Sequence, residues 1–380
     1  MDKFSFPKEE LVLEVLEKYT NTVYRLAFSR TKNSHDAEDI MQNVFMKFIK
    51  YDIDFKSEEH IKAWLIKVTI NLSKNLLTSA WFRKTTTLED DVVVTMKEEN
   101  EYSNSENNKT NNNVKEEPVK KGVYVPKQQL GVIDPNLQAY RIATLVYKGR
   151  IYTIEGTEIS LEEGKVLMDK KIGITWDLID EIKENVTSAG YVDLESLKDF
   201  ASFGHGDEVY TVKGYNEDFR LITYTKNEYG EFISLWECLN YFILADGSDI
   251  FGMMNIKDNI ESAAWETFNN WNYGTLDEKE VSIDDTLNNF IDAIYKGIPY
   301  SLEDEELRNE LFNKESNFSS GEDYFNANEE IQKFLFLKMK DGTKVELRLF
   351  KNGYIYYSGL SFAFKLDEEA FINMWNKLDI

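Results

Sequence analysis

The chain contains 380 residues, with 44 Lys and Arg against 68 Asp and Glu, which gives a formal net charge of −24. Hydrophobic residues make up 42% of it, enough for a core, and the length suggests two or three domains. The single cysteine excludes an intrachain disulfide, and no apolar run approaches the roughly 20 residues of a membrane span. We therefore expect a soluble, cytoplasmic, multidomain protein with no membrane partner.

The charge is unevenly distributed along the chain. Residues 1–90 contain 14 basic and 14 acidic residues, so the whole net charge of −24 lies beyond them. Residues 100–113 contain seven Asn and no aliphatic residue, a composition that cannot bury enough apolar surface to fold. We predict a helical domain over residues 1–85, a mostly disordered low-complexity linker over 86–135, and an acidic domain over 136–380.

The first 85 residues have the apolar periodicity of helices. Leu11, Val15, Tyr19 and Val23 follow Pro7 at helical spacing and predict a first helix of about 20 residues. A second helix is predicted over residues 36–50, and a third from the N-cap Ser57 to about residue 82. Together they predict an all-α three-helix bundle.

The acidic domain reads as an α+β body with an antiparallel sheet. Strands are predicted at residues 209–212, 219–225 and 232–235, with a hairpin over 145–154 that turns at Lys148-Gly149. Asp341-Gly342 and Asn352-Gly353 predict the two turns of a three-strand meander over residues 334–358. Helices are predicted at residues 161–169, 176–184, 259–268, 283–295 and 367–378.

Residues that carry catalytic or metal chemistry are sparse. Gly204-His205-Gly206-Asp207 is the sharpest candidate, but it fits a turn before a strand better than a catalytic site. The sequence has no phosphate loop, dinucleotide fingerprint or EF-hand spacing, and three His with one Cys leave little for a zinc site. We expect no enzyme, no metal and no cofactor.

Two blocks in the helical domain carry a family resemblance. The run Asp36-Ala37-Glu38-Asp39-Ile40-Met41-Gln42-Asn43-Val44-Phe45 is followed by Phe55, Ala63-Trp64-Leu65 and Asn71-Leu72. In order and spacing, these blocks resemble region 2 of the sigma-70 family in its extracytoplasmic-function (ECF) form. The resemblance covers about residues 8–85.

The resemblance implies a surface for RNA polymerase on the second predicted helix. Asp36, Asp39, Gln42, Asn43 and Met46 would dock on the clamp helices of the largest subunit of core RNA polymerase. Asn43 stands where the family usually has Glu, which removes one charged contact. Ile40, Val44 and Phe45 are expected in the core.

It also implies a surface for the −10 promoter element on the third helix. The candidate DNA-binding residues are Lys56, Lys62, Lys67, Asn71, Lys74, Arg83 and Lys84. Lys67, Asn71 and Lys74 share one helix face because they are four and three residues apart. The family usually ends this helix in a dense Arg/Lys run, which is mostly replaced here by residues 76–82, so we expect weak DNA affinity. Trp64 is expected in the core, whereas Trp81-Phe82 could stack on a base or close the bundle.

Beyond the linker, we find no segment that resembles the helix-turn-helix of sigma region 4. The acidic body instead resembles the sensor-type domain of membrane-anchored Firmicute anti-sigma proteins. This implies an ECF-like sigma factor for transcription initiation whose acidic domain regulates it, by docking directly on the cations of the third helix in competition with DNA.

The alternative is a non-initiating interaction protein, a decoy that binds polymerase or an anti-sigma factor. A separate protein could supply region 4. A third hypothesis, an enzyme in the acidic body, would need a pocket with convergent polar groups around His205.

Overall fold

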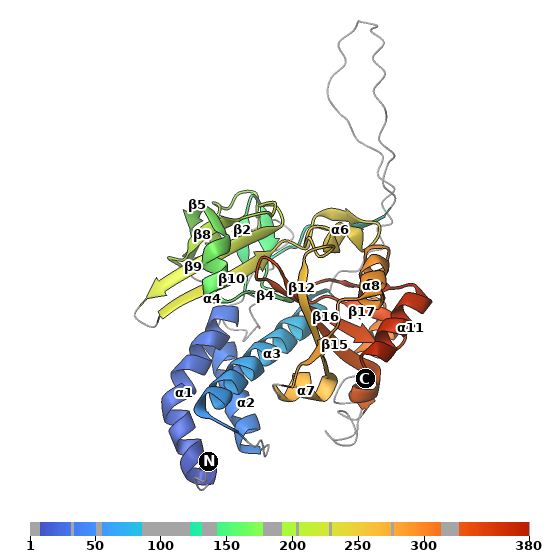
Figure 1. Cartoon of the computed structure of the whole chain (residues 1–380). Helices are drawn as coiled ribbons and strands as arrows, with labels where there is room; N and C mark the ends of the chain where they lie inside the picture. Colours follow the sequence, from blue (N-terminus) through green and yellow to red (C-terminus); the bar gives the residue numbers. More distant parts are fainter. Residues whose placement is uncertain are drawn as a thin grey trace, which may run out of the picture.

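The computed structural model describes residues 8–31, 34–50, 55–85, 122–130, 143–177, 192–202, 205–227, 230–274, 277–312 and 327–379. The helices within residues 8–85 are called the head, and the described residues from 122 to 379 are called the body. The head packs against the body along helix α3 (Glu58–Thr85), which lies beside strands β12 (Ile260–Thr267), β15 (Gln332–Met339) and β16 (Lys344–Phe350) in Figure 1.

Three helices form the head and share one apolar core. Helix α1 spans Lys8–Thr31, α2 spans Ser34–Lys50, and α3 follows from Glu58. Trp64 and Val44 are fully buried in this core, and the ring of Phe55 meets Trp64 edge-on at 5.8 Å. The Tyr19 hydroxyl donates a 2.8 Å hydrogen bond to Glu58, which joins α1 to the start of α3.

The larger part of the body is an eight-stranded sheet with helices packed on it. Its strand order is β13-β12-β15-β16-β17-β18-β14, and β4 pairs with the side of β16. Its helices α8 and α11 pack on each other and cover one face with Phe290 and Phe371. The remaining bounds here are β4 Thr157–Glu158, β13 Lys279–Val281, β14 Ile298–Ser301, β17 Tyr354–Tyr356, β18 Phe362–Lys365, α6 Ser248–Phe251, α7 Phe268–Tyr273, α8 Asp285–Tyr295, α9 Glu305–Leu311 and α11 Glu368–Lys377.

The smaller part of the body holds three further sheets. One is four-stranded with the order β10-β9-β8-β5, a second has the order β3-β2-β7-β6, and β1 pairs with β11. The bounds are β1 Val123–Val125, β2 Leu145–Tyr147, β3 Arg150–Tyr152, α4 Leu161–Leu167, β5 Met168–Ile174, β6 Trp176–Asp177, β7 Ala201–Ser202, β8 Glu208–Val212, β9 Arg220–Asn227, β10 Gly230–Glu237 and β11 Phe242–Leu244. The chain is thus a multidomain protein with an N-terminal helical region and an antiparallel body.

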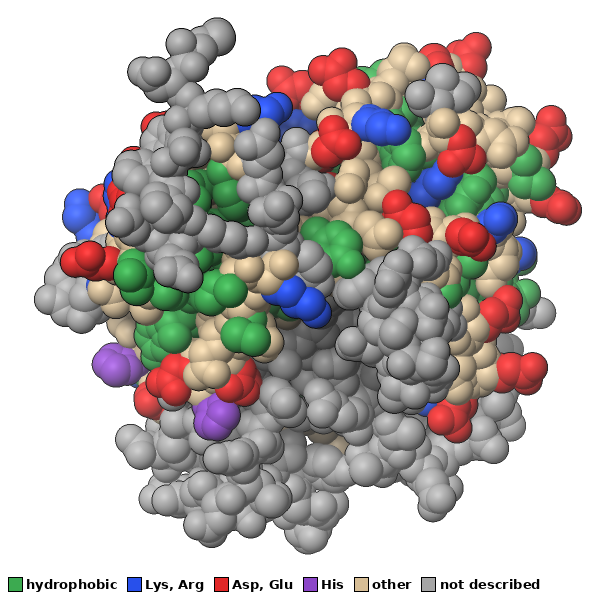
Figure 2. All heavy atoms as spheres, turned by 90° about the horizontal axis from the view of Figure 1, so that it is seen from below, with side chains coloured by type: hydrophobic (Ala, Val, Ile, Leu, Met, Phe, Trp, Pro, Cys, Tyr) green, Lys and Arg blue, Asp and Glu red, His purple; other side chains and the backbone are tan. Residues whose placement is uncertain are grey.

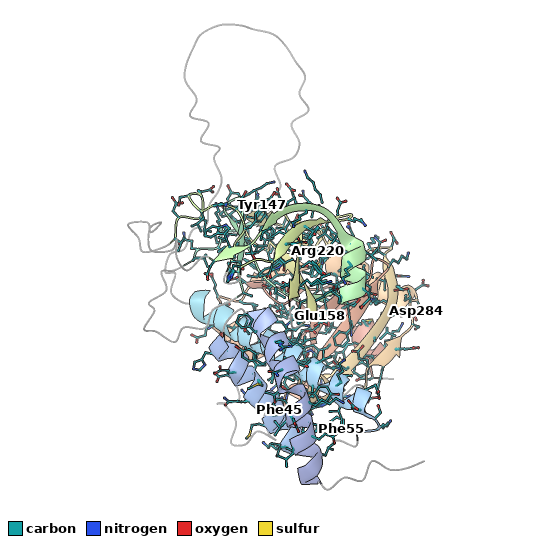
Figure 3. All side chains as sticks on the ribbon, turned by 90° about the vertical axis from the view of Figure 1, so that its left-hand side faces the viewer. Phe45, Phe55, Tyr147, Glu158, Arg220 and Asp284 are labelled. Atoms are coloured by element: carbon teal, nitrogen blue, oxygen red, sulfur yellow. The ribbon has the colours of Figure 1, made fainter. Side chains whose placement is uncertain are left out.

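A fully buried polar network joins the two parts of the body. The Arg220 guanidinium on β9 lies 2.7 Å from Glu237 on β10 and donates a 3.0 Å hydrogen bond to Thr157 on β4. The Tyr357 hydroxyl, beyond β17, donates to Glu237 and lies 2.7 Å from Thr157. Arg220 is labelled well inside the body in Figure 3. Because a buried charge without its partner is costly, this network fixes the sheets relative to each other.

Most elements predicted from the sequence are present. The hairpin at Lys148-Gly149, the strands β8, β9 and β10, the meander β15-β16-β17 and helices α4, α8 and α11 lie where expected. Gly342 and Gly353 have φ of 92° and 89°, as turn glycines between these strands do. His205 precedes β8 in an exposed turn, as the simpler interpretation predicted.

Three predictions were wrong in whole or in part. A helix was predicted over residues 259–268, but Ile260–Thr267 form β12, because this segment pairs with both β13 and β15 and buries the alternating Ala263 and Trp265. Trp176–Asp177 is strand β6, paired in parallel with β7, so the helix predicted over residues 176–184 does not begin at Trp176, and residues 178–184 lie outside the described residues. The predicted linker extends too far, because β1 pairs with β11 and Leu130 is buried. Residues 86–121 lie outside the described residues.

The buried network yields a stability prediction. Arg220→Met leaves the Glu237 carboxylate buried and unpaired, and should lower the free energy of unfolding by about 3–5 kcal/mol. Lys226→Met on the same strand removes the ion pair with Glu231 from a side chain that is 69% exposed, and should cost less than about 1 kcal/mol. Urea unfolding measures both, and equal losses would contradict the role of the network.

Candidate nucleic-acid interface

Helix α3 has two adjacent buried faces. Ile61, Trp64, Leu65 and Val68 point into the head core, and Lys67, Asn71 and Lys74 lie on the face turned to the body. The spacing of four and three residues puts these polar side chains in one row. The predicted DNA-contacting row of α3 therefore lies in an intramolecular interface.

Lys67 is held by two carboxylates of the body. Its Nζ atom lies 2.7 Å from Glu266 Oε2 on β12 and 3.8 Å from Glu278 Oε1 before β13. The Glu266 side chain is fully buried, and Lys344 extends the cluster with a 2.9 Å contact to Glu278. The ammonium group of this predicted DNA contact thus meets carboxylates of the body.

The middle of the interface is formed by the short helix α7. The Asn71 amide donates to the backbone carbonyl of Trp271, and Lys47 of α2 donates to that of Asn272 at 2.9 Å. Gly274 ends α7 with a φ of 68°, and a Cβ atom there would lie 2.3 Å from Val68 of α3. The close approach of α3 to α7 therefore requires glycine at this position.

Lys74 lies at the centre of the interface. Its Nζ atom is 2.7 Å from Glu158 on β4 and 2.6 Å from Glu346 on β16, and Glu346 also accepts a 3.2 Å bond from the Trp271 indole. Glu158 lies where the helices meet the body in Figure 3. Burial would lower the pKa of Lys74, but the two carboxylates outweigh it and raise that pKa.

The interface also includes a half-buried arginine from α1. Arg30 interacts electrostatically with Glu158, Glu346 and Glu155, and its Nε and Nη2 atoms are buried with no hydrogen-bond partner among the described atoms. Burial lowers the pKa of this guanidinium. Burial would raise the pKa of Glu158, but Lys74 and Arg30 outweigh that effect and lower it to about 2.

Two other buried carboxyl groups of the body have raised pKa values. Burial raises the pKa of Glu155 to about 8, and burial raises that of Glu266 to about 7 against the opposing effect of Lys67. Near neutral pH these two groups are therefore at least partly protonated, unlike Glu158.

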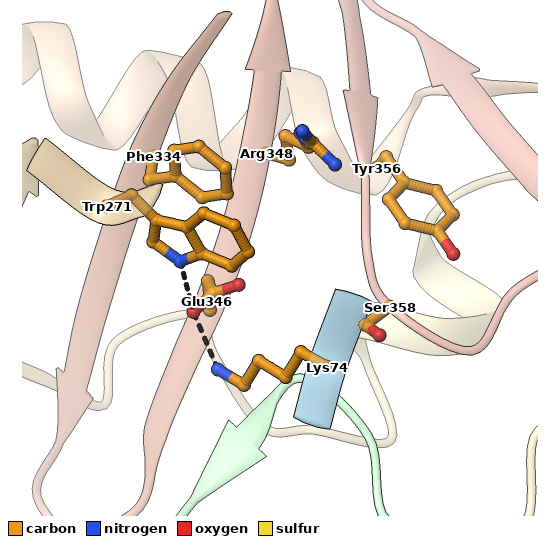
Figure 4. A pocket seen from close by; sticks show the side chains of 7 residues that line it. All are labelled: Lys74, Trp271, Phe334, Glu346, Arg348, Tyr356 and Ser358. Atoms are coloured by element: carbon orange, nitrogen blue, oxygen red, sulfur yellow. Dashed lines mark hydrogen bonds and ion pairs between the residues drawn. The ribbon is translucent and has the colours of Figure 1, made fainter. Parts of the chain in front are cut away.

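A small cavity lies beside Lys74. It measures about 20 Å³, enough for one water molecule, and Figure 4 shows Ser358 close to the lysine with Arg348 and Tyr356 farther from it. The Trp271 and Phe334 rings stack at 4.3 Å on another side. Its size makes it a packing gap rather than a ligand site.

Two other predicted DNA-binding residues make none of the described contacts of this interface. Lys56 and Lys62 are exposed, and the side chains of Arg83 and Lys84 lie outside the described residues, as do those of Trp81 and Phe82. The structure brings together Lys67, Asn71 and Lys74, and adds Arg30 and Lys47, which we had not predicted. The neutral head and acidic body signalled such docking, but no sequence pattern identified the carboxylates involved.

The predicted polymerase-binding residues lie on a different face. Gln42, Asn43 and Met46 are exposed on α2, and Asp39 is half-exposed beside His35, 3.4 Å away. Asp36 is buried in the first turn of α2, so its carboxylate does not share that surface. Ile40, Val44 and Phe45 are buried in the core, as expected.

Charge is mixed over the outer surface. Figure 2 shows acidic side chains spread among basic and apolar ones on one face.

The described residues contain no group of three or more His, Cys, Asp or Glu suited to a metal ion. None of the described helices is long and apolar enough to cross a membrane.

Comparison with known proteins supports the helical part of this interpretation. Residues 15–83 match the family model of sigma-70 region 2. The ECF RNA polymerase sigma factor SigM of Bacillus subtilis (strain 168) is 40% identical over 60 residues. That alignment covers 15% of this chain and 35% of the relative, so the chain spans about a third of the relative's length. No solved structure matched the chain. The two matches support a likeness to sigma-70 region 2 in the N-terminal helical part of the chain.

The glycine of α7 gives a test of the interface. Gly274→Ala inserts a methyl group against Val68 and should loosen α3 from the body, so amide hydrogen exchange in residues 58–74 should accelerate. Gly214→Ala is the matched control, because its φ of 81° imposes a similar backbone cost while nothing lies within 4 Å. Equal exchange in both variants would contradict the close contact.

The raised pKa of Glu266 gives a pH prediction. The carboxyl titrates near 4.5 when unfolded and near 7 when folded, so the folded chain holds a proton that the unfolded chain has lost between these values. The stabilisation by this proton is complete below about pH 4.5 and is lost as the pH rises through 7, a change on the order of 3 kcal/mol.

Glu266→Gln removes this titration. The unfolding free energy of the variant should therefore fall less than that of the wild type between pH 5 and pH 8, as measured by urea unfolding. Parallel pH profiles for the two proteins would show that Glu266 titrates normally.

Proposed function

We propose that this protein is an ECF-like sigma factor that binds core RNA polymerase and the −10 promoter element, and that its acidic body regulates it. In this proposal α2 contacts the clamp helices of the largest subunit and α3 contacts promoter DNA. The family match over residues 15–83 supports the first part. The absence of region 4 and the cytoplasmic location remain predictions.

One observation carries the regulatory part of the proposal. Lys67, Asn71 and Lys74 have their polar atoms engaged by Glu266, the Trp271 carbonyl, and Glu158 with Glu346. Lys67 and Lys74 are about 10.5 Å apart along the helix axis at 1.5 Å per residue. The body carboxylates take the position of phosphates on this row, so DNA and the body compete for it.

The burial of these contacts makes the competition effective. Exposed charges more than about 8 Å apart are screened at physiological salt, but ion pairs removed from water are screened much less. Lys74 is only 5% exposed at its side chain, and Glu266 is fully buried. Salt therefore weakens DNA binding by the head more than it weakens the ion pairs between the head and the body.

The alternative is a non-initiating decoy that binds polymerase or an anti-sigma partner. The contacts of Lys67, Asn71 and Lys74 with the body favour this alternative, because a chain held in this arrangement binds no promoter through α3. The proposed resemblance of the body to anti-sigma sensor domains suits either function. A separate region 4 protein would complete promoter recognition under the first proposal.

Charge reversal on the body side tests the proposal without altering the head. Glu158→Lys with Glu346→Lys places two cations against Lys74 and should release α3, raising promoter-complex formation and run-off transcription by about tenfold or more with purified core RNA polymerase. A promoter library serves as template, because the target promoter is unidentified.

The matched control is Glu261→Lys with Glu369→Lys. Both side chains are exposed on the body and the change in net charge is the same. A gain in the control equal to that of the interface variant would reduce the effect to general electrostatics. If the wild type and both double variants bind polymerase but give no transcript, the result would favour the decoy.

A further inference from the structure

Helix α2 carries two separate surfaces. Lys47 faces the body, where its Nζ atom donates to Asn272 and lies 5.7 Å from the Tyr273 ring centre. Asp39, Gln42 and Met46 lie on another side of the same helix. At 100° per residue, they are turned from Lys47 by about 80°, 140° and 100°, all away from the apolar core.

The outer surface stays open while the body covers α3. Met46 is 63% exposed and Ile49 45% exposed, and Gln42 and Asn43 are exposed beside them. The described contacts between head and body run instead through α3, Lys47 and the C-terminal end of α1. An exposed Met and Ile within a polar surround is the composition of a protein-binding surface.

We propose that the closed chain binds core RNA polymerase through this open face of α2 while its DNA-contacting row stays covered by the body. This rests on the proposed function and adds a state to it: a polymerase complex that holds a sigma-like head yet cannot contact promoter DNA through α3. The sigma factor and the decoy are then the open and closed forms of one molecule.

The proposal has a thermodynamic consequence. A ligand that binds two states equally does not shift their equilibrium, however tight the binding. If α2 is equally accessible in both forms, polymerase binding does not open the chain. Opening then depends on promoter DNA, which competes for α3 directly, or on a ligand of the body.

Two binding measurements on the full chain test this. The wild type and the Glu158→Lys, Glu346→Lys variant are compared for affinity to purified bacterial core RNA polymerase and, as polymerase complexes, to single-stranded −10 DNA. We expect polymerase affinities within about twofold of each other and DNA affinity at least tenfold higher for the variant. Met46→Glu should weaken polymerase binding at least tenfold in both backgrounds, which assigns the contact to α2.

Two other outcomes would overturn either this inference alone or the proposed function as well. Polymerase binding at least tenfold weaker for the wild type than for the variant would show that the body also blocks α2, and would reject this inference alone. Binding of polymerase by neither form would reject the proposed function, and the inference with it. If the double variant fails to fold, Gly274→Ala replaces it, with Gly214→Ala as its control, and the same comparisons apply.

Discussion

The charges around Lys74 are the constraint on which the arrangement of this molecule depends. An ammonium group removed from water is tolerated only when carboxylates meet it, and Glu158 and Glu346 do so from two different strands. Those strands, β4 and β16, pair with each other, so the carboxylates converge only in the folded body. Separation of head from body breaks these ion pairs, and hydration of the freed charges offsets only part of the attraction that is lost when the geometry of the buried pairs is good.

The body is built to present these carboxylates rigidly. β4 carries Thr157 beside Glu158, and Thr157 belongs to the buried network of Arg220, Glu237 and Tyr357. The strand that holds one carboxylate against the head is thus tied to both parts of the body. A change in the smaller part of the body has a direct physical route to the interface, through a network with few alternative arrangements.

Local patterns in the sequence were sufficient to predict most helices and strands, but they could not identify the residues that meet between head and body. The periodicity of the helices and the Asp-Gly and Asn-Gly turns are short-range signals, and they located α8, α11 and β15-β16-β17 correctly. Residues 260–267 misled the prediction because Ala263 and Trp265 alternate within a segment whose pairing partners lie far away in the chain. Lys67, Asn71 and Lys74 were chosen correctly as one face of a helix. Their partners at positions 158, 266, 271 and 346 are adjacent only through tertiary folding.

The covalent connection of head and body sets how difficult the interface is to open. A partner on the same chain acts at an effective concentration that reaches the millimolar range, which free DNA at cellular concentrations does not match. A DNA-binding row with few cations, weakened further by the loss of the Arg/Lys run at the end of α3, competes poorly against such a partner. Promoter DNA gains the same intramolecular advantage once polymerase holds both it and the head. Under the proposed function, initiation therefore requires polymerase to bind first, which an accessible α2 allows and a covered α2 would prevent.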